Sequence, residues 1–538
     1  MCGILALIKT LKTNNSTKID SILKSGEPLS NRGPDNREVC QNDDGVFVFY
    51  RLSIMDVSDN GKQPFRIDNC TLVCNGEIYN FKELIKKYDL QCSSGSDCEV
   101  IIRLYLKLND FYETVSLLDG VFAIVLLDKN KNKLFVARDR VGVRPLFFGI
   151  SKEKEVVISS LVKSMLPLCS RNTQTGYVDN IHPIVPNTTM TYDLSSSEHN
   201  IEINIIPKPV LSPQHLDFNL ENSIKQVRDI LYNSVKKRVN TDRPIACLLS
   251  GGLDSSIIAA LLCKVLGSEN VRTYSIGMKG STDLFYAQKV ADFLKTQHSV
   301  VHFTEQEGLD SIPYVVETIE SYDITTVRAS VPMWLISKYI SDNTDDKVIF
   351  SGEGADELFC GYLYFHNAPN NQELEYESKR LVNELYTYDV LRSDRTVSDC
   401  GLEFREPFLD KELLEFALNL PGEIKKPING YEKYILRRAF EDILPKEVIW
   451  RRKEGFSDGN SSLDRAWKDI IGEHVDKIID AYDSEQFMSK EQYYYVQLFN
   501  SYFPGYNLIL PPWMPKWSGD LKDPSGRLIQ AFDEKMDI

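Results

Sequence analysis

The pattern of hydrophobic and polar positions divides the chain into two parts with different periods. From residue 1 to about 205 it shows short runs rich in β-branched and aromatic residues, several of them bounded by turn residues, which is typical of strands. The predicted strands cover residues 2–8, 46–50, 71–75, 121–128 and 133–138. The polar stretch 128–133 predicts a hairpin turn between the last two. We therefore expect a largely antiparallel sheet structure with a few helices.

The second part has a different rhythm. Residues 194–216 contain a serine run and several prolines and predict a linker. Beyond them, strands are expected at 244–249, 271–276, 299–303 and 348–351, and helices at 254–266 and 283–294. Alternating strands and helices indicate a doubly wound parallel sheet, in which ligands bind beyond the carboxyl ends of the strands. We expect one domain over residues 1–205 and another over 206–538.

Composition narrows the class of protein. A chain of 538 residues exceeds a single hydrophobic core, and 42% hydrophobic with 26% charged residues is ordinary globular composition. No apolar run approaches the ~20 residues of a membrane span, and the first residues lack the basic region of a secretory signal. Eleven irregularly spaced cysteines suit a reducing compartment, so a cytoplasmic location is expected. The net charge of -15 argues against nucleic acid as a partner but leaves a nucleotide pocket open.

The first candidate nucleophile is Cys2. Because a small second residue permits removal of the initiator methionine, its thiol and a free α-amine would share one residue. That amine titrates near ~7.7–8.0 and can take the thiol proton. All seven histidines lie at or beyond His182, so a Cys-His pair built within the first 181 residues is excluded. On its own, Cys2 is equally compatible with a small buried residue in the first strand.

Neighbouring motifs supply the other groups that amide hydrolysis by a thiol needs. Asn75-Gly76-Glu77, following a predicted strand, offers an amide side chain and a glycine N–H in a tight turn for an oxyanion. Arg51 could fork onto the carboxylate of a free amino acid, and Asp97 could hold its ammonium group. Taken singly, an Asn-Gly pair is a common hairpin turn, and a lone Arg or Asp is usually a solvated surface charge.

Six motifs in order resemble the glutaminase domain of class II (N-terminal nucleophile) glutamine amidotransferases. They are Met-Cys-Gly-Ile at 1–4, Arg-Gly-Pro-Asp at 32–35, Arg-Leu-Ser-Ile at 51–54, Asn-Gly-Glu-Ile-Tyr-Asn at 75–80, Leu-Asp-Gly-Val-Phe-Ala at 118–123 and Arg-Asp-Arg-Val-Gly-Val-Arg-Pro-Leu at 138–146. The resemblance implies an αββα antiparallel sandwich in which Cys2 is the nucleophile and Asn75 and Gly76 form the oxyanion hole. It also implies that glutamine is bound by Arg51, Leu52, Ser53, Ile54, Met55, Asn75, Gly76, Glu77 and Asp97.

The sequence departs from that family pattern at several positions. Asn31 and Phe49 stand where histidines are usual, and Leu161 replaces a glutamate. Asn187 replaces a glycine in a turn, which is a mild change because asparagine tolerates positive φ best among the other residues. The change at Leu161 bears on the coupling between the two domains more than on glutamine hydrolysis.

A second site is predicted where an apolar strand meets a helix. The segment Ser250-Gly251-Gly252-Leu253-Asp254-Ser255-Ser256 has paired glycines that let backbone approach phosphate, and a helix N-terminus favours negative charge. It is no Walker A loop, since no Gly-Lys-Ser/Thr follows. Asp254 suggests a Mg²⁺ ligand. Without further context the segment is also compatible with a turn and a helix cap, but as a whole it resembles the PP-loop of ATP pyrophosphatases.

A second acidic cluster, residues 351–358, follows the strand predicted at 348–351. Asp356 is the natural second Mg²⁺ ligand, and Glu353 could act as a base on attacking ammonia or hold an ammonium group. With segments 320–330, 403–410 and 452–459 it is similar to the synthetase domain of asparagine synthetases, of eukaryotic type at the carboxyl end. The resemblance implies ATP contacts at Leu249, Ser250, Gly251, Gly252, Asp254, Ser255, Ser256, Ile276, Ser351, Gly352 and Lys453, with Mg²⁺ on Asp254 and Asp356, and a helical C-terminal part.

Together these resemblances imply a carbon–nitrogen ligase that makes asparagine from aspartate, glutamine and ATP. Glutamine would be cleaved through a thioester on Cys2, and ATP would form a β-aspartyl-adenylate, giving glutamate, AMP and pyrophosphate. The alternatives are a β-lactam synthetase-like relative, a class II amidotransferase acting on another substrate, an ammonia-dependent synthetase with an impaired glutaminase, and a nucleotide-binding scaffold without turnover. No membrane partner is expected, and a homodimer is possible because the family often dimerises.

Overall fold

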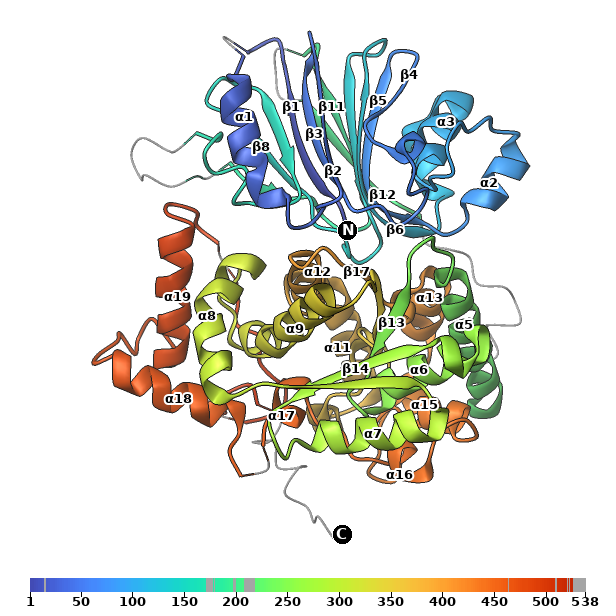
Figure 1. Cartoon of the computed structure of the whole chain (residues 1–538), viewed down its shortest axis with the longest axis vertical. Coiled ribbons are helices and arrows are strands. Elements are labelled where there is room, and N and C mark those ends of the chain that lie inside the picture. The colour runs from blue at the N-terminus through green and yellow to red at the C-terminus, as the bar shows by residue number, and fades with distance from the viewer. Residues whose placement is uncertain are drawn as a thin grey trace.

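A computed structural model of the chain describes residues 1–13, 16–170, 178, 180–196, 200–207, 218–462, 464–508, 510–519, 521 and 523–525. These residues form two halves, and the N-terminus lies at the junction between them (Figure 1). Within the described ranges no helix combines the length and apolarity that a membrane crossing requires. Most of the linker predicted at 194–216 lies outside the described residues, which lack 197–199 and 208–217.

The N-terminal half contains two antiparallel sheets with the strand orders β10-β8-β9-β1-β3-β2 and β12-β11-β7-β6-β5-β4. The strands of the first are β1 (Gly3–Ile8), β2 (Asn36–Asn42), β3 (Gly45–Arg51), β8 (Phe147–Ile150), β9 (Val156–Ser159) and β10 (His182–Pro183). Those of the second are β4 (Phe65–Ile67), β5 (Cys70–Ile78), β6 (Gly120–Asp128), β7 (Lys133–Arg138), β11 (Thr188–Asp193) and β12 (Ile201–Ile205). The helices are α1 (Ile19–Gly26), α2 (Phe81–Tyr88), α3 (Glu99–Leu108) and α4 (Phe111–Ser116).

The two sheets lie face to face between outer layers of helix. Successive side chains of a strand point to opposite faces. In β1, Ile4 and Ala6 join the core between the sheets, whereas Leu5 and Leu7 pack on the other face with Ile22 of α1. The outer face of the second sheet is covered by α2, α3 and α4. The predicted αββα sandwich is confirmed.

The C-terminal half is built on a parallel sheet of order β15-β14-β13-β16-β17. Its strands are β13 (Ile245–Leu248), β14 (Arg272–Gly277), β15 (Gln297–His302), β16 (Val348–Phe350) and β17 (Glu403–Arg405). The helices are α5 (Leu220–Arg238), α6 (Leu253–Leu266), α7 (Thr282–Leu294), α8 (Glu305–Ile319), α9 (Ile324–Asn343), α10 (Ala355–Leu358), α11 (Asn371–Glu384), α12 (Asp389–Ser398), α13 (Lys411–Asn419), α14 (Gly422–Lys425), α15 (Tyr434–Phe440), α16 (Lys446–Ile449), α17 (Phe456–Gly459), α18 (Trp467–Ile478) and α19 (Lys490–Tyr502).

Helices cover both faces of this sheet, as the alternation of strands and helices predicts. Cys247 of β13 belongs to the core shared with α5, α6 and α7, and its neighbour Ala246 belongs to the core shared with α8 and α9. The chain leaves β13 towards β14 on one side, while β16 pairs with β13 on the other. Ligands bind at such a switch point, beyond the carboxyl ends of the strands. The segments after β13 and β16 are the two predicted nucleotide-site clusters.

Two local predictions are wrong. Asn75, Gly76 and Glu77 were expected in a tight turn, but β5 runs on to Ile78 because each of them pairs with a residue of β6. Part of the predicted linker is strand β12, which pairs with β11 at the sheet edge. In β5, a partner strand distant in sequence extends the sheet beyond what the local turn residues indicate, whereas β12 pairs with β11, the strand directly before it in the chain.

Candidate functional site

The first site is at Cys2, the residue before β1. The Cys2 N–H donates to Asn75 Oδ1 at 2.8 Å, and the Leu52 N–H lies 3.4 Å from Cys2 Sγ. Asn75 is 1% exposed, and its Nδ2 has no hydrogen-bond partner among the described residues. Burial raises the pKa of the Cys2 thiol. A buried amide donor without a partner near a thiol meets the requirement for stabilising an oxyanion formed on that thiol.

Gly76 is needed where it lies because β5 and β6 are in close contact. A Cβ at this position would come within 2.2 Å of the Val121 carbonyl oxygen. The glycine therefore lets the strand carry Asn75 towards Cys2 and Glu77 towards the junction without separating the sheet. Close strand contact, not a tight turn, is thus the reason for glycine at this position, and its N–H as an oxyanion donor stays a prediction.

Met1 precedes the predicted nucleophile, and its α-amine is buried at the junction. The nitrogen lies 4.0 Å from Glu403 Oε2, and burial is the main cause that lowers its pKa. In the chain with Met1, the nitrogen of Cys2 is a peptide nitrogen. The use of the Cys2 α-amine as a base therefore depends on removal of Met1 and stays a prediction.

One buried acid, Glu77, belongs to β5, and a second, Asp97, lies beside this strand. The Ile78 N–H donates to Asp97 Oδ2 at 2.6 Å, and burial raises the pKa of Asp97 to about 6. Burial, with the charges of Glu403 and Asp97, raises the pKa of Glu77 well above its usual range, although Arg405 donates to Glu77 Oε2 at 3.0 Å. Such an acid pair favours an added positive charge, which fits the ammonium group of an amino acid.

Arg51, at the end of β3, has its terminal nitrogens directed at backbone. They donate to the carbonyl oxygens of Ser58 at 2.9 Å and of Asp56. The guanidinium thus orders the loop that follows the segment 51–55, and a substrate carboxylate would have to share its N–H groups. Its predicted role in binding glutamine, like that of Leu52, Ser53, Ile54 and Met55, stays a prediction.

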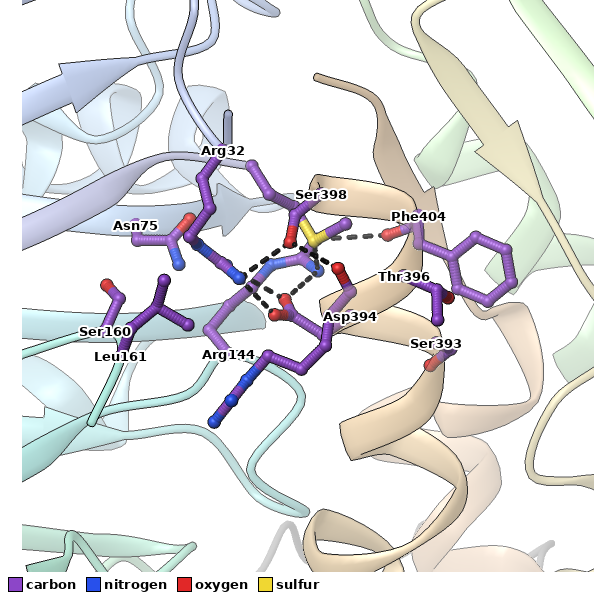
Figure 2. Close-up of polar contacts among 12 residues, drawn as sticks. Arg32, Asn75, Arg144, Ser160, Leu161, Ser393, Asp394, Thr396, Ser398 and Phe404 are labelled. Carbon is purple, nitrogen blue, oxygen red and sulfur yellow. Dashed lines mark hydrogen bonds and ion pairs between the residues drawn. The ribbon is translucent and has the colours of Figure 1, made fainter. Parts of the chain in front are cut away.

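Two arginines from the N-terminal half meet α12 at the junction, and Figure 2 shows both side chains turned towards Asp394. Arg32 donates to the Cys2 carbonyl oxygen through Nε at 3.0 Å and to Asp394 and Ser398 through Nη1, both at 2.7 Å. Arg144 donates to the Phe404 carbonyl oxygen at 3.1 Å. The peptide of the proposed nucleophile is thereby tied, through one side chain, to the other half of the molecule.

The positions that depart from the family pattern also take part in the junction. Leu161 is buried, and the next two N–H groups, of Val162 and Lys163, donate to the Glu320 carboxylate at 3.1 and 2.8 Å. Asn31 donates to Asp399 Oδ1 at 3.0 Å. Glu320 of the C-terminal half thus binds the two residues that follow Leu161, the position at which the family pattern has a glutamate.

The second site begins where β13 leads into α6. Gly251 has φ +71°, and a Cβ there would come within 2.3 Å of the Ala287 nitrogen in α7. Ser250 and Ser255 hydroxyls lie 3.0 Å apart and close the loop. Gly252 caps α6 without a side-chain bond to the first N–H groups. These donors at a helix N-terminus are suited to phosphate.

The acidic cluster, residues 351–358, follows β16, the strand that pairs with β13. Arg392 donates to Glu353 Oε2 at 2.7 Å, yet burial raises the pKa of Glu353 to about 7. Burial alone would raise the pKa of Asp356, but Lys433 and Lys453 hold it well below its usual range. A carboxyl with a pKa near neutrality is suited to proton transfer at physiological pH.

The chemistry of the acids fits the expected Mg²⁺. Lys433 Nζ lies 2.6 Å from Asp254 Oδ2 and 2.7 Å from Asp356 Oδ1, so both carboxylates converge on one point. Asp254 Oδ1 is buried without a hydrogen-bond partner in the part of the chain that the structure describes. That part holds no group of three or more His, Cys, Asp or Glu suited to a metal. Two carboxylates plus phosphates are the usual Mg²⁺ environment in nucleotide sites.

One cleft brings most of the predicted nucleotide residues together. Those that line it are Leu249, Ser250, Gly252, Asp254, Ser255, Ile276, Ser351, Gly352, Glu353, Asp356 and Lys453. Gly251 and Ser256 do not line it and act on the loop's shape, Ser256 by donating to the Gly252 carbonyl oxygen at 2.6 Å. Sequence reasoning missed Lys433, Arg392 and Asp389, which also line the cleft and lie in segments without a motif signal.

Comparison with known proteins covers the whole chain. The profile of the asparagine synthase family matches residues 226–380 and 368–508, and that of the glutamine amidotransferase domain matches residues 1–194. The chain is 39% identical to the glutamine-hydrolysing asparagine synthetase of Gallus gallus over 567 residues, with 99% of each chain covered. The enzymes of the same name from Homo sapiens and Rattus norvegicus are 40% and 39% identical, again with 99% of each chain covered.

Proposed function

The chain belongs to the family of glutamine-hydrolysing asparagine synthetases, and from that premise we propose that it makes asparagine from aspartate with glutamine as nitrogen donor and ATP as energy source. The observation that carries this proposal is the presence of two candidate sites, one for each half-reaction, in one chain. Asn75 Nδ2 has no partner in the described residues near Cys2, and the PP-loop lies beside two converging carboxylates.

Glutamine hydrolysis is assigned to the N-terminal half. Once Met1 is removed, the Cys2 α-amine takes the thiol proton, and the sulfur attacks the side-chain amide carbon of glutamine. The oxyanion accepts hydrogen bonds from Asn75 Nδ2 and the Gly76 N–H. The carbon–nitrogen bond then breaks, ammonia leaves with the proton, and water hydrolyses the thioester to glutamate. Arg51 to Met55, Glu77 and Asp97 hold the glutamine.

Aspartate activation is assigned to the C-terminal half. The side-chain carboxylate of aspartate attacks the α-phosphorus of ATP, and pyrophosphate leaves to give β-aspartyl-AMP. Ammonia attacks the acyl carbon, Glu353 accepts a proton from it, and AMP leaves. Lys453 and the N–H groups at the start of α6 bind phosphates. Asp254 and Asp356 would hold Mg²⁺, which supplies positive charge beside the phosphates.

The two steps need a protected transfer of ammonia. At neutral pH free ammonia is mostly protonated and cannot act as a nucleophile, so passage between the halves without release to solvent preserves its reactivity. The bond of Arg32 to both the Cys2 carbonyl oxygen and α12 supports a tight junction around this passage.

The remaining assignments follow from the same premise. We place the domain boundary near residue 205, because β12 ends at Ile205 in the N-terminal sheet and α5 begins at Leu220. A cytoplasmic location is proposed from the cysteine usage, and a homodimer through the glutaminase domains is proposed from the family.

The test compares nitrogen donors. Pyrophosphate release and asparagine formation are measured with ATP and aspartate, using glutamine or ammonium chloride, in wild type and in Cys2→Ala. Glutamine is expected to support asparagine formation only in the wild type, and ammonium in both. If ammonium works but glutamine fails in both proteins, the glutaminase assignment is wrong. If neither donor gives asparagine, the proposal as a whole is wrong.

A further inference from the structure

Lys433 lies between the two carboxylates to which the proposed function assigns the metal. Its Nζ contacts Asp254 Oδ2 at 2.6 Å and Asp356 Oδ1 at 2.7 Å. A cation that touches both acids stands where a bridging divalent ion would stand, because Mg²⁺ also binds carboxylate oxygens. Lys453 differs, since of these two acids it contacts Asp356 alone, at 2.6 Å from Oδ2, within the described residues.

The backbone around Lys433 is shaped to keep this side chain in place. Lys433 has φ 54° and ψ 35°, a left-handed conformation that residues with a Cβ avoid, and its side chain is 1% exposed. At Gly361, a Cβ would lie 2.1 Å from Asp356 Oδ1 and 2.7 Å from Lys433 Cε. A strained backbone that its surroundings hold in place is typical of functional positions.

The charges of this group explain what the lysine does. Asp254 and Asp356 carry two negative charges, and Lys433 and Lys453 compensate both. A free divalent cation would therefore meet two carboxylates already paired with ammonium groups and would find Lys433 between its ligands. The triphosphate brings several negative charges that offer the ammonium groups other partners.

We propose that Lys433 is a positioning residue that fills the metal position between Asp254 and Asp356 until the triphosphate draws its ammonium group away, so that the metal enters only together with the nucleotide. This inference rests on the proposed assignment of those two acids as metal ligands. It gives the binding order of metal and nucleotide a structural cause within the chain.

The test measures protein-bound Mn²⁺ by equilibrium dialysis of the full chain, with and without α,β-methylene-ATP, in wild type and in Lys433→Met. Wild type is expected to bind Mn²⁺ at least about tenfold more tightly with the analogue than without it. Lys433→Met is expected to bind Mn²⁺ alone at least about tenfold more tightly than wild type, since a neighbouring positive charge is gone. A purely structural lysine predicts the opposite, a weaker site when it is removed.

Lys453→Met is the matched control, because it removes one charge from Asp356 and leaves Lys433 between the acids. Its gain in Mn²⁺ affinity is expected to stay below about threefold, since the bridging position remains filled. If Lys433→Met and Lys453→Met gained equal Mn²⁺ affinity, the gain would come from net charge alone, and the proposal that Lys433 fills the metal position would be wrong. Lys289→Met, at a surface pair with Glu447, is expected to match wild type.

Lys433→Gln covers the case in which the methionine variant fails to fold, because the amide keeps hydrogen-bond donors without the charge. If it binds Mn²⁺ alone no better than wild type, the inference is wrong. If wild type binds Mn²⁺ with the analogue and the Lys433 variants have the same Mn²⁺ affinities as wild type, the inference is wrong but the assignment of the metal ligands stands. Wild type that binds no Mn²⁺ even with the analogue overturns both.

Discussion

A single side-chain amide is placed for the chemistry proposed at the first site. Asn75 Oδ1 is fixed by the Cys2 N–H, so Nδ2 points to a place where no other described residue satisfies it. We expect Asn75→Ala to lower glutamine hydrolysis roughly 10²–10³-fold, because one oxyanion donor is lost, and to leave ammonium-dependent synthesis unchanged. Glutamate release and ammonium-dependent pyrophosphate release measure the two effects.

Asn80→Ala is the control for that prediction, since both ends of its amide are bonded. Nδ2 donates to the Leu117 carbonyl oxygen and Oδ1 accepts from the Asp119 N–H, each at 2.9 Å. This variant is expected to change stability without changing the ratio of the two activities. A loss of hydrolysis in Asn75→Ala that is no larger than in Asn80→Ala would remove Asn75 from the oxyanion hole.

Glu353 predicts how ammonium-dependent synthesis changes with pH. Burial raises the pKa of Glu353 to about 7, so below that pH the carboxyl holds a proton and cannot accept one from ammonia. With the concentration of free NH₃ held constant, kcat is expected to fall about tenfold per pH unit below pH 7. Asp389 contributes to raising this pKa, so Asp389→Asn should move the break to lower pH. A flat profile would contradict a base role for Glu353.

Which site residues could be predicted depended on where their partners lie. Cys2, Asn75 and Asp254 belong to short motifs with a recognisable pattern, so the sequence alone was enough to single them out as candidates. Lys433 was missed because its role exists only through Asp254 and Asp356, 179 and 77 residues away. Arg405 was missed for the same reason, since Glu77 lies 328 residues from it.

At the scale of elements, periodicity predicted the strands well where their pairing is local. Strands 121–128 and 133–138 and the hairpin between them match β6 and β7, whose residues face each other across one turn. The extension of β5 through Gly76 was not predictable, because an Asn-Gly pair favours a turn and only the β6 partner overrides it. Apolar alternation predicted the fold class, and long-range pairing decided the element ends.

The PP-loop depends on how close α6 and its loop come to α7. We expect Gly251→Ala to destabilise the protein by about 2–5 kcal/mol, because the residue has positive φ and its Cβ would meet the backbone of α7. Gly280 is the control, because it has φ +83° but open space where a Cβ would lie. Gly280→Ala should therefore lose about 1–2 kcal/mol of unfolding free energy, from the left-handed backbone alone. Urea denaturation of both variants measures the difference. Equal losses would show that α7 does not constrain the loop.

At the scale of the molecule, a buried ion pair links the proposed glutamine site to the sheet of the other half. Arg405 is fully buried at the end of β17, next to β16, and donates to Glu77 of the glutaminase half at 3.0 Å and to Glu403 at 2.8 Å. Removing its charge takes from Glu77 its buried cationic partner and from Glu403 one of its positive neighbours. The pair therefore couples the stability of the junction to the position of a proposed glutamine ligand.

Arg405→Met is accordingly expected to cost about 3–5 kcal/mol of unfolding free energy and to raise KM for glutamine more than KM for ammonium. With Glu77→Gln it should give a coupling energy of about 0.5–3 kcal/mol in a double-mutant cycle. Arg243→Met tests the stability of the same junction at a half-exposed pair. Arg243 lies 3.2 Å from Asp35 and also donates to the Ser53 carbonyl oxygen at 2.7 Å, and loss of the ion pair should cost at most about 1 kcal/mol. The prediction fails if the two arginine variants lose equal unfolding free energy and change KM for glutamine and KM for ammonium equally. The Arg405–Glu77 pair would then contribute no more than a surface ion pair. Coupling between the halves would have to come from the contacts of Arg32 and Arg144 with α12.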